Sequence, residues 1–397
     1  MDKTPADDLA AQGGARALQG SAVEGFAVET HDGLIFTVKG LVHPPDRRIA
    51  YLRYAPDPRG DRERDGRRYR KLHGFAEQLE ALEGHGGVLE VHGGVLERQG
   101  EAYLVFDPVA GAVLQGVPVE AAARVFDPRR RLREVAARGP ADALEEAALA
   151  LAQLLRETAA VPGAALGVTG SLLVGLQTPD SDVDLVVYGS ESCRAVHAAL
   201  GALLDDTSSP LRRPAGEDLA AIHAAHRRET PLGAEDFARL QKAKVNEGLF
   251  SGRAFFVRFV KAPGEVTERY GDFRYEPLGP ATVEARVAGA AEAVFTPCRY
   301  LVEAATVLET ATAGPAEAEV EAATGLEPAI ARPAGADAAP VALREIVSFR
   351  GRFADQAREG ERVRARGTLE RVLPRSGAPF ARLVVGAPGD YLLSLPG

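Results

Sequence analysis

Apolar residues recur at helical spacing between positions 141 and 160. This spacing places them on one face of a helix, with polar residues on the other. Pro140 precedes the stretch and Pro162 follows it, and prolines at these places are typical of helix boundaries. The pattern predicts an amphipathic helix that covers a hydrophobic core.

The pattern changes to short strands and helices after this helix. Residues 164–169 form an apolar run, and residues 182–188 alternate like a strand with one buried face. Further helices are expected at 172–177, 191–204 and 234–247, and a further strand at 253–261. This alternation predicts a mixed sheet flanked by helices.

The N-terminal part of the chain has a β pattern. Strands are expected at 34–38 and 49–54, where β-forming residues stand between turn signals, and a short helix at 69–82. The hexapeptide HGGVLE begins at His85 and again at His92. Each Gly-Gly pair favours a hairpin turn over a metal site shared by the two histidines.

A β pattern returns beyond residue 265, interrupted at 311–340 by a tract of Ala, Glu, Pro and Gly that predicts a flexible insertion. Several short strands separated by turns suit a small barrel. The whole chain is therefore expected to have an α+β fold. Its expected parts are a disordered leader (1–20), a β-rich module (21–138), a core of mixed sheet and helices (139–265), and a β-barrel-like module (266–397).

Composition and charge narrow the class of protein. The 397 residues contain no run of about twenty apolar residues and no signal-peptide pattern, so a cytoplasmic protein without a membrane span is expected. Cys193 and Cys298, the two cysteines, are expected to be buried free thiols. The net charge of −9 argues against nonspecific coating of nucleic acid. Three arginine-rich stretches, at 59–71, 129–138 and 344–382, are expected to be solvated surface.

Two aspartates carry the clearest chemical signal. In an extended strand, residues two apart point to the same side, so Asp182 and Asp184 project together. The paired charges repel each other unless a cation compensates them. Oxygen ligands suit a hard ion, so the pair predicts a site for Mg²⁺ or Mn²⁺.

A phosphate-binding turn is expected just before these aspartates. Gly170 allows the backbone to approach a ligand, and Ser171 offers a hydroxyl and an amide at the start of a short helix. A phosphate-binding turn beside a magnesium site is what transfer of a nucleotidyl group requires.

The Gly-Ser turn, the spacer and the string SDVDL together resemble the signature of the DNA polymerase β-like nucleotidyltransferase superfamily, over residues 141–261. More narrowly, residues 32–54 make the chain similar to uncharacterised archaeal nucleotidyltransferases. The resemblance implies that Asp182 and Asp184 hold two metal ions. It also implies that Gly170 and Ser171 contact the triphosphate of an NTP, with ATP expected.

The resemblance also implies a third carboxylate on a later strand. Arg258 stands at the centre of the strand expected at 253–261, and the next acids in the chain are Glu265 and Asp272. The third carboxylate is one of these two acids, or it lies elsewhere in the chain, or it is missing. Lys242 and Arg258 are expected to contact the nucleotide phosphates.

The expected activity is transfer of an NMP from an NTP to a hydroxyl, on an acceptor that is RNA, protein or a small molecule. The alternative is an inactive nucleotide- or RNA-binding regulator that retains the fold. A third hypothesis is an antitoxin-like enzyme that modifies a partner protein, but such proteins are generally compact single domains and this chain has 397 residues.

Overall fold

The computed structural model describes residues 22–84, 90–92, 95–97, 103–227, 229–310 and 341–396. The chain divides into two compact units. The first unit comprises residues 1–106, 114–212 and 246–270, and the second comprises residues 107–113, 213–245 and 271–397. The expected leader, the glycine pairs that follow His85 and His92, and the expected insertion at 311–340 lie outside the described residues.

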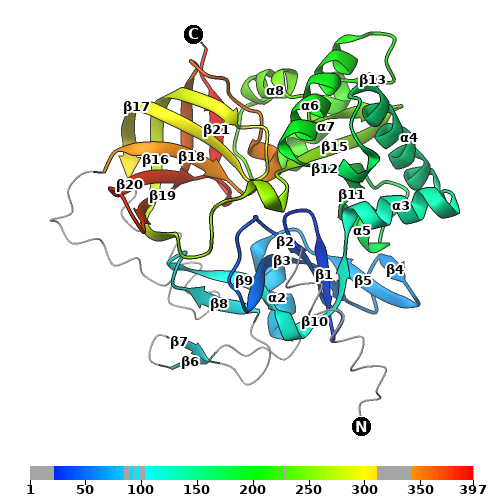
Figure 1. The fold of residues 1–397 in the computed structure, drawn as a ribbon, viewed down its shortest axis with the longest axis horizontal. Helices are drawn as coiled ribbons and strands as arrows, with labels where there is room; N and C mark the ends of the chain where they lie inside the picture. The colour runs from blue at the N-terminus through cyan, green and yellow to red at the C-terminus, as the bar shows by residue number, and fades with distance from the viewer. Residues whose placement is uncertain are drawn as a thin grey trace. The chain divides into compact units, whose positions relative to one another are not determined.

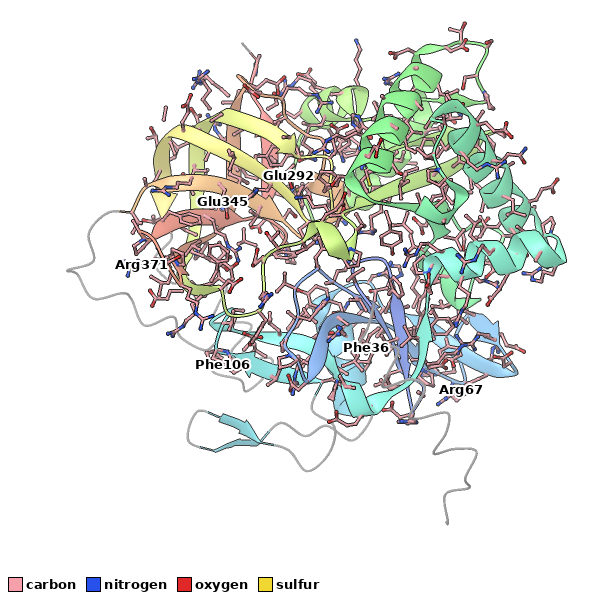
Figure 2. The ribbon with its side chains drawn as sticks, viewed as in Figure 1. Phe36, Arg67, Phe106, Glu292, Glu345 and Arg371 are labelled. Carbon is pink, nitrogen blue, oxygen red and sulfur yellow. The ribbon has the colours of Figure 1, made fainter. Side chains whose placement is uncertain are left out.

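An antiparallel sheet built from N-terminal residues belongs mainly to the first unit (Figure 1). Its strand order is β10-β1-β2-β3-β5-β4, and β9 pairs with β3 and β8. Phe36 of β2 is fully buried in this sheet (Figure 2). The elements are β1 (Ala27–Thr30), β2 (Ile35–Val38), β3 (Arg47–Pro56), β4 (Arg62–Arg64), β5 (Arg67–Lys71), α2 (Phe75–Gly84), β8 (Leu104–Asp107), β9 (Ala112–Pro118) and β10 (Ala122–Phe126), with a separate hairpin of β6 (Glu90–His92) and β7 (Val95–Glu97).

A second, mixed sheet of the first unit has the order β11-β12-β15-β14-β13. Its two central strands, β12 and β15, run parallel, and the other pairs are antiparallel. Helices α4 and α6 pack on β12 and on each other, with Leu151 and Leu155 of α4 fully buried. The elements are α3 (Pro128–Arg138), α4 (Ala143–Thr158), β11 (Leu166–Val168), α5 (Gly170–Val174), β12 (Val183–Tyr188), α6 (Ser190–Asp205), β13 (Leu211–Arg212), β14 (Glu247–Phe250) and β15 (Arg253–Val260).

The second unit contains a six-stranded sheet in which β16 pairs with both β17 and β19. These pairings close a ring of β16, β17, β18, β20 and β19 around a core that includes Val283, Tyr300 and Leu383. The elements are α7 (Gly216–His226), α8 (Ala234–Ala243), β16 (Phe273–Glu292), β17 (Cys298–Thr310), β18 (Leu343–Ser348), β19 (Arg362–Pro374), β20 (Phe380–Val384) and β21 (Tyr391–Ser394).

One expectation about local structure was wrong. The helix expected at 69–82 begins only at Phe75, because Tyr69 is fully buried in β5 and paired with β3 and β4. The arginine-rich stretch at 129–138 is helix α3, and Arg130, Arg133 and Arg138 are exposed on it, as expected of solvated surface. Asp127 caps its N-terminus, and Leu132 and Val135 are buried.

Cys193 and Cys298 are buried and free, as predicted, and burial raises the pKa of each thiol to about 12. In the described part of the chain, no helix combines the length and the apolar character needed to cross a membrane.

Candidate active site

The two aspartates lie at the N-terminal end of β12. Asp182 comes just before the strand and is exposed, and Asp184 is its second residue and is partly buried. Val183, Leu185 and Val187 are fully buried on the other face, under α4 and α6. The alternation of the strand therefore turns both carboxylates to the face that the helices leave open.

The glycine of the predicted phosphate-binding turn lies directly against Asp184. Gly170 has a φ of +64°, and a methyl group at this position would lie 2.1 Å from Oδ2 of Asp184. The backbone N–H of Thr169 donates to the carbonyl oxygen of Asp184 at 2.9 Å. Ser171 follows as the buried second residue of α5. The structure thus brings together Gly170, Ser171 and Asp184, with Asp182 two residues before Asp184.

Both carboxylates have a raised pKa. Loss of hydration is the main cause for Asp184, the charge of Asp182 adds to it, and its pKa is raised to about 6. Loss of hydration also raises the pKa of Asp182, against the opposing charges of Lys71 and Arg253. A poorly hydrated pair of like charges is stabilised by a bound cation.

The donor set fits a magnesium ion that keeps part of its water shell. Mg²⁺ is commonly held by one or two carboxylates together with waters and substrate phosphates. Within the described ranges, no group of three or more His, Cys, Asp or Glu side chains could hold a metal ion. The oxygens of Asp182 and Asp184 fit such an ion, whose other ligands would be water and phosphate.

Arg258 lies on the same face of the sheet as Asp184. In the register of the parallel pair, Asp184 stands beside Phe256 and Val186 beside Arg258. The guanidinium of Arg258 donates to Glu24 at 2.8 Å, and Glu24 also accepts from Lys39 Nζ at 3.4 Å. The side chain of Glu24 is 1% exposed. Arg258 therefore has a buried ion-pair partner, and a direct contact with phosphate stays a prediction.

Glu265, one of the acids suggested for a third carboxylate, lies away from the aspartates. Glu265 accepts hydrogen bonds from the backbone N–H and hydroxyl of Ser190, the first residue of α6. Ser190 follows the C-terminal end of β12, whereas the aspartates lie at its N-terminal end. The rise of about 3.3 Å per residue puts these ends well over 10 Å apart. Asp272 belongs to the second unit, and its role as a third carboxylate stays a prediction.

Glu24 is an acid near the site that sequence reasoning missed. It lies over the open face of the sheet, where its backbone carbonyl accepts from the Tyr188 hydroxyl at 3.0 Å. Its carboxylate is occupied by Arg258, Lys39 and the backbone N–H of Gly40. A carboxylate that is buried and paired in this way is poorly suited to accept a proton from a substrate.

Lys242 lies on α8 in the second unit, apart in the chain from the other predicted residues. Its backbone carbonyl accepts from Nε of Arg213 at 3.1 Å. A contact between Lys242 and the nucleotide stays a prediction.

Part of the arginine-rich stretch at 59–71 packs on the site, contrary to its expected role as solvated surface. Arg62 Nη1 donates to the carbonyl of Leu176 at 2.6 Å, and Arg64 Nη1 donates to that of Val174 at 2.9 Å. These carbonyls belong to the segment between Ser171 and Asp182. Residues 62–64 alternate between arginine and glutamate, as the side chains of a strand alternate between its two faces. This alternation was a signal in the sequence that the arginines belong to a strand with one packed face.

Comparisons with known proteins agree with this geometry. The model of the nucleotidyltransferase domain family matches residues 150–223, which include the Gly-Ser turn and both aspartates. The uncharacterised protein MJ1086 of Methanocaldococcus jannaschii is 30% identical over 369 residues, which cover 90% of this chain and 94% of that protein. No solved structure matches. The chain is thus similar to this archaeal protein over most of its length, and it belongs to the DNA polymerase β-like nucleotidyltransferases.

Proposed function

We propose that this protein transfers an NMP from an NTP, ATP in the first place, to a hydroxyl acceptor and releases pyrophosphate. The observation that carries the proposal is the contact between the Gly-Ser turn and the aspartate pair. Gly170 leaves no room for a side chain beside the carboxylate of Asp184. A triphosphate on this turn would have its oxygens next to an ion held by the aspartates.

Each part of the site has a role in this proposal. Asp182 and Asp184 bind the metal, and Gly170 and Ser171 orient the triphosphate. A bound Mg²⁺ or Mn²⁺ supplies charge neutralisation at the phosphates and at the departing pyrophosphate. The two carboxylates suit one ion of this kind, and the second ion implied by the superfamily would need oxygens from the acceptor and the phosphates.

The raised pKa of Asp184 gives the reaction a pH dependence. A protonated Asp184 is a poor ligand, so metal binding competes with a proton whose pKa is about 6. Activity is therefore expected to fall as the pH drops below this value.

One observation favours a second function, that of a nucleotide-binding regulator without activity. Glu265 caps α6, and Glu24 is paired with Arg258, so neither is suited to activate an acceptor hydroxyl. An acceptor that arrives already ionised, or an acid from another part of the chain, would restore activity.

Transfer of label from ATP separates these two functions. The full chain is incubated with α-labelled or γ-labelled ATP, Mg²⁺ or Mn²⁺, and RNA, protein and small-molecule acceptors. The proposal expects acceptors to gain label from the α position alone, and Asp182→Asn/Asp184→Asn to abolish the transfer. Asp180→Asn, which alters an exposed neighbour, serves as the control and should remain active. Metal-dependent ATP binding without turnover on any acceptor supports the regulator instead.

A further inference from the structure

The hairpin of β4 and β5 is fixed to the segment that connects the Gly-Ser turn with the aspartates. Arg62 and Arg64 donate to the carbonyls of Leu176 and Val174, and Arg64 also forms an ion pair with Glu29. Below these contacts lies a shared hydrophobic core, made by Ala27, Ile35, Tyr54, Tyr69, Phe126, Leu173, Val174 and Leu176. Strand β5 therefore has a defined position relative to α5.

Lys71, the last residue of β5, points to the same side as this core. It lies two residues after the buried Tyr69, and in the β3–β5 register it stands opposite Tyr54, which is also buried. Residues two apart on a strand share a face. The ammonium group therefore lies on the side of the sheet that covers α5 and the approach to the aspartates.

Lys71 lies among both positive and negative groups. Its electrostatic neighbours are Arg53, Arg62, Asp182 and Asp184. Within the described residues, the ammonium group of Lys71 forms no hydrogen bond and no ion pair within 4.0 Å. Burial and the two arginines lower its pKa, against the opposing effect of the aspartates.

The balance of charge becomes more positive when a metal binds. Lys71, Arg53 and Arg62 stand against Asp182 and Asp184, and Asp61 pairs with Arg62 at 3.8 Å, so these charges balance before a metal binds. A divalent cation would leave an excess of positive charge, which is unfavourable in a poorly hydrated place. A polyanion that arrives with the metal would compensate the excess.

We infer that Lys71 binds the β- and γ-phosphates of the nucleotide, and that Arg62 and Arg53 are positioning residues that hold β5 and raise the local positive potential. This inference rests on the proposed function, because it assigns a contact to the same nucleotide. It makes the N-terminal β-rich module a part of the nucleotide site.

Calorimetric titration of the full chain tests the inference without requiring turnover. The ligands are inorganic tripolyphosphate, ATP and AMP, each with and without Mg²⁺. The variant is Lys71→Gln, and Arg68→Gln is the matched control, because Arg68 is an exposed residue on the opposite face of the same strand. Loss of one charge-assisted contact weakens binding by about ten- to a hundredfold.

The expected result is a loss of that size for tripolyphosphate and ATP with Lys71→Gln, no change for AMP, and unchanged binding with Arg68→Gln. Lys71→Arg should restore most of the affinity. Unchanged tripolyphosphate binding by folded Lys71→Gln, or an equal loss for AMP, would overturn the inference. If Lys71→Gln does not fold, the wild-type chain with methylated lysines replaces it, and tripolyphosphate must shift the Lys71 signal in its NMR spectrum.

The two proposals fail in different ways. If tripolyphosphate binding depends on Lys71 but the chain transfers no label, the inference about Lys71 holds and the transferase function is wrong. If Lys71→Gln transfers label with an unchanged KM for ATP, the transferase function holds and the inference about Lys71 is wrong.

Discussion

At the scale of single residues, the site depends on Gly170, which has no side chain. Gly170 combines a φ of +64° with contact to the carboxylate of Asp184. Sequence reasoning could propose Gly170, Ser171 and the two aspartates as site residues, because close backbone approach and strand alternation are local properties. It could not propose Lys71, whose position depends on the pairing of β5 with β3.

Substitution of Gly170 should damage both stability and ligand binding. Gly170→Ala imposes a left-handed backbone on alanine and drives its methyl group against Asp184. Gly216→Ala is the control, because Gly216 has a φ of +54° with nothing within 4 Å of its added methyl group. The control should lose about 1–2 kcal/mol of unfolding free energy.

Urea unfolding of both variants measures the difference. Gly170→Ala should lose at least about 1 kcal/mol more than the control, since it adds a steric clash to the same backbone cost. It should also lose binding of Mg²⁺ and ATP. Equal losses in the two variants, with ATP binding intact, would contradict the contact with Asp184.

Asp184 should make the metal-free protein less stable as the pH rises. Its pKa is about 6 in the folded chain and near 3.8 in the unfolded chain, so between these values the folded state binds more protons. Stability therefore decreases with rising pH in this window. The decrease is about 1–3 kcal/mol, with allowance for the partial exposure of the side chain.

Unfolding in EDTA at pH 4.5 and pH 7 tests this dependence. Asp184→Asn should be more stable than the wild type at pH 7, and its advantage should shrink at pH 4.5. Asp180→Asn should behave like the wild type. Mg²⁺ should narrow the difference in stability between Asp184→Asn and the wild type at pH 7. A difference of the same size at both pH values would argue against a perturbed Asp184.

At the scale of elements, the site forms where a short helix and two parallel strands meet. The helix expected at 141–160 is α4 (Ala143–Thr158), and the strand expected at 253–261 is β15 (Arg253–Val260). Both segments have a strong hydrophobic periodicity, which can be read directly from the sequence. The wrong start of the helix expected at 69–82 comes from long-range pairing, since Tyr69 lies in β5 and pairs with β3.

The ion-pair cluster of Glu24 should be a major determinant of stability for β15. Glu24→Gln leaves Arg258 and Lys39 without their buried partner, and removal of one partner of a buried pair costs about 3–5 kcal/mol. A double-mutant cycle with Arg258→Met, followed by urea unfolding, measures the coupling. The double variant should lose less stability than the sum of the single losses, and strict additivity would show that the pair is not coupled.

At the scale of the whole molecule, the chain divides into two compact units, and the active-site residues described above lie in the first. The boundaries of these units were beyond sequence reasoning, because residues 213–245 group with the C-terminal strands although they precede β15 in the chain. A sequence pattern shows where elements begin and end, whereas this grouping arises from packing between distant segments. The identity of the acceptor cannot be read from the sequence for the same reason, because it depends on surfaces rather than on a motif.

The most direct test of the central claim is the ratio of pyrophosphate released to labelled acceptor formed, measured in one reaction with α-labelled ATP and Mg²⁺. Nucleotidyl transfer predicts one pyrophosphate for each labelled acceptor in the wild type, and neither product with Asp182→Asn/Asp184→Asn. Release of orthophosphate in place of pyrophosphate, or turnover that survives the loss of both aspartates, would contradict the account.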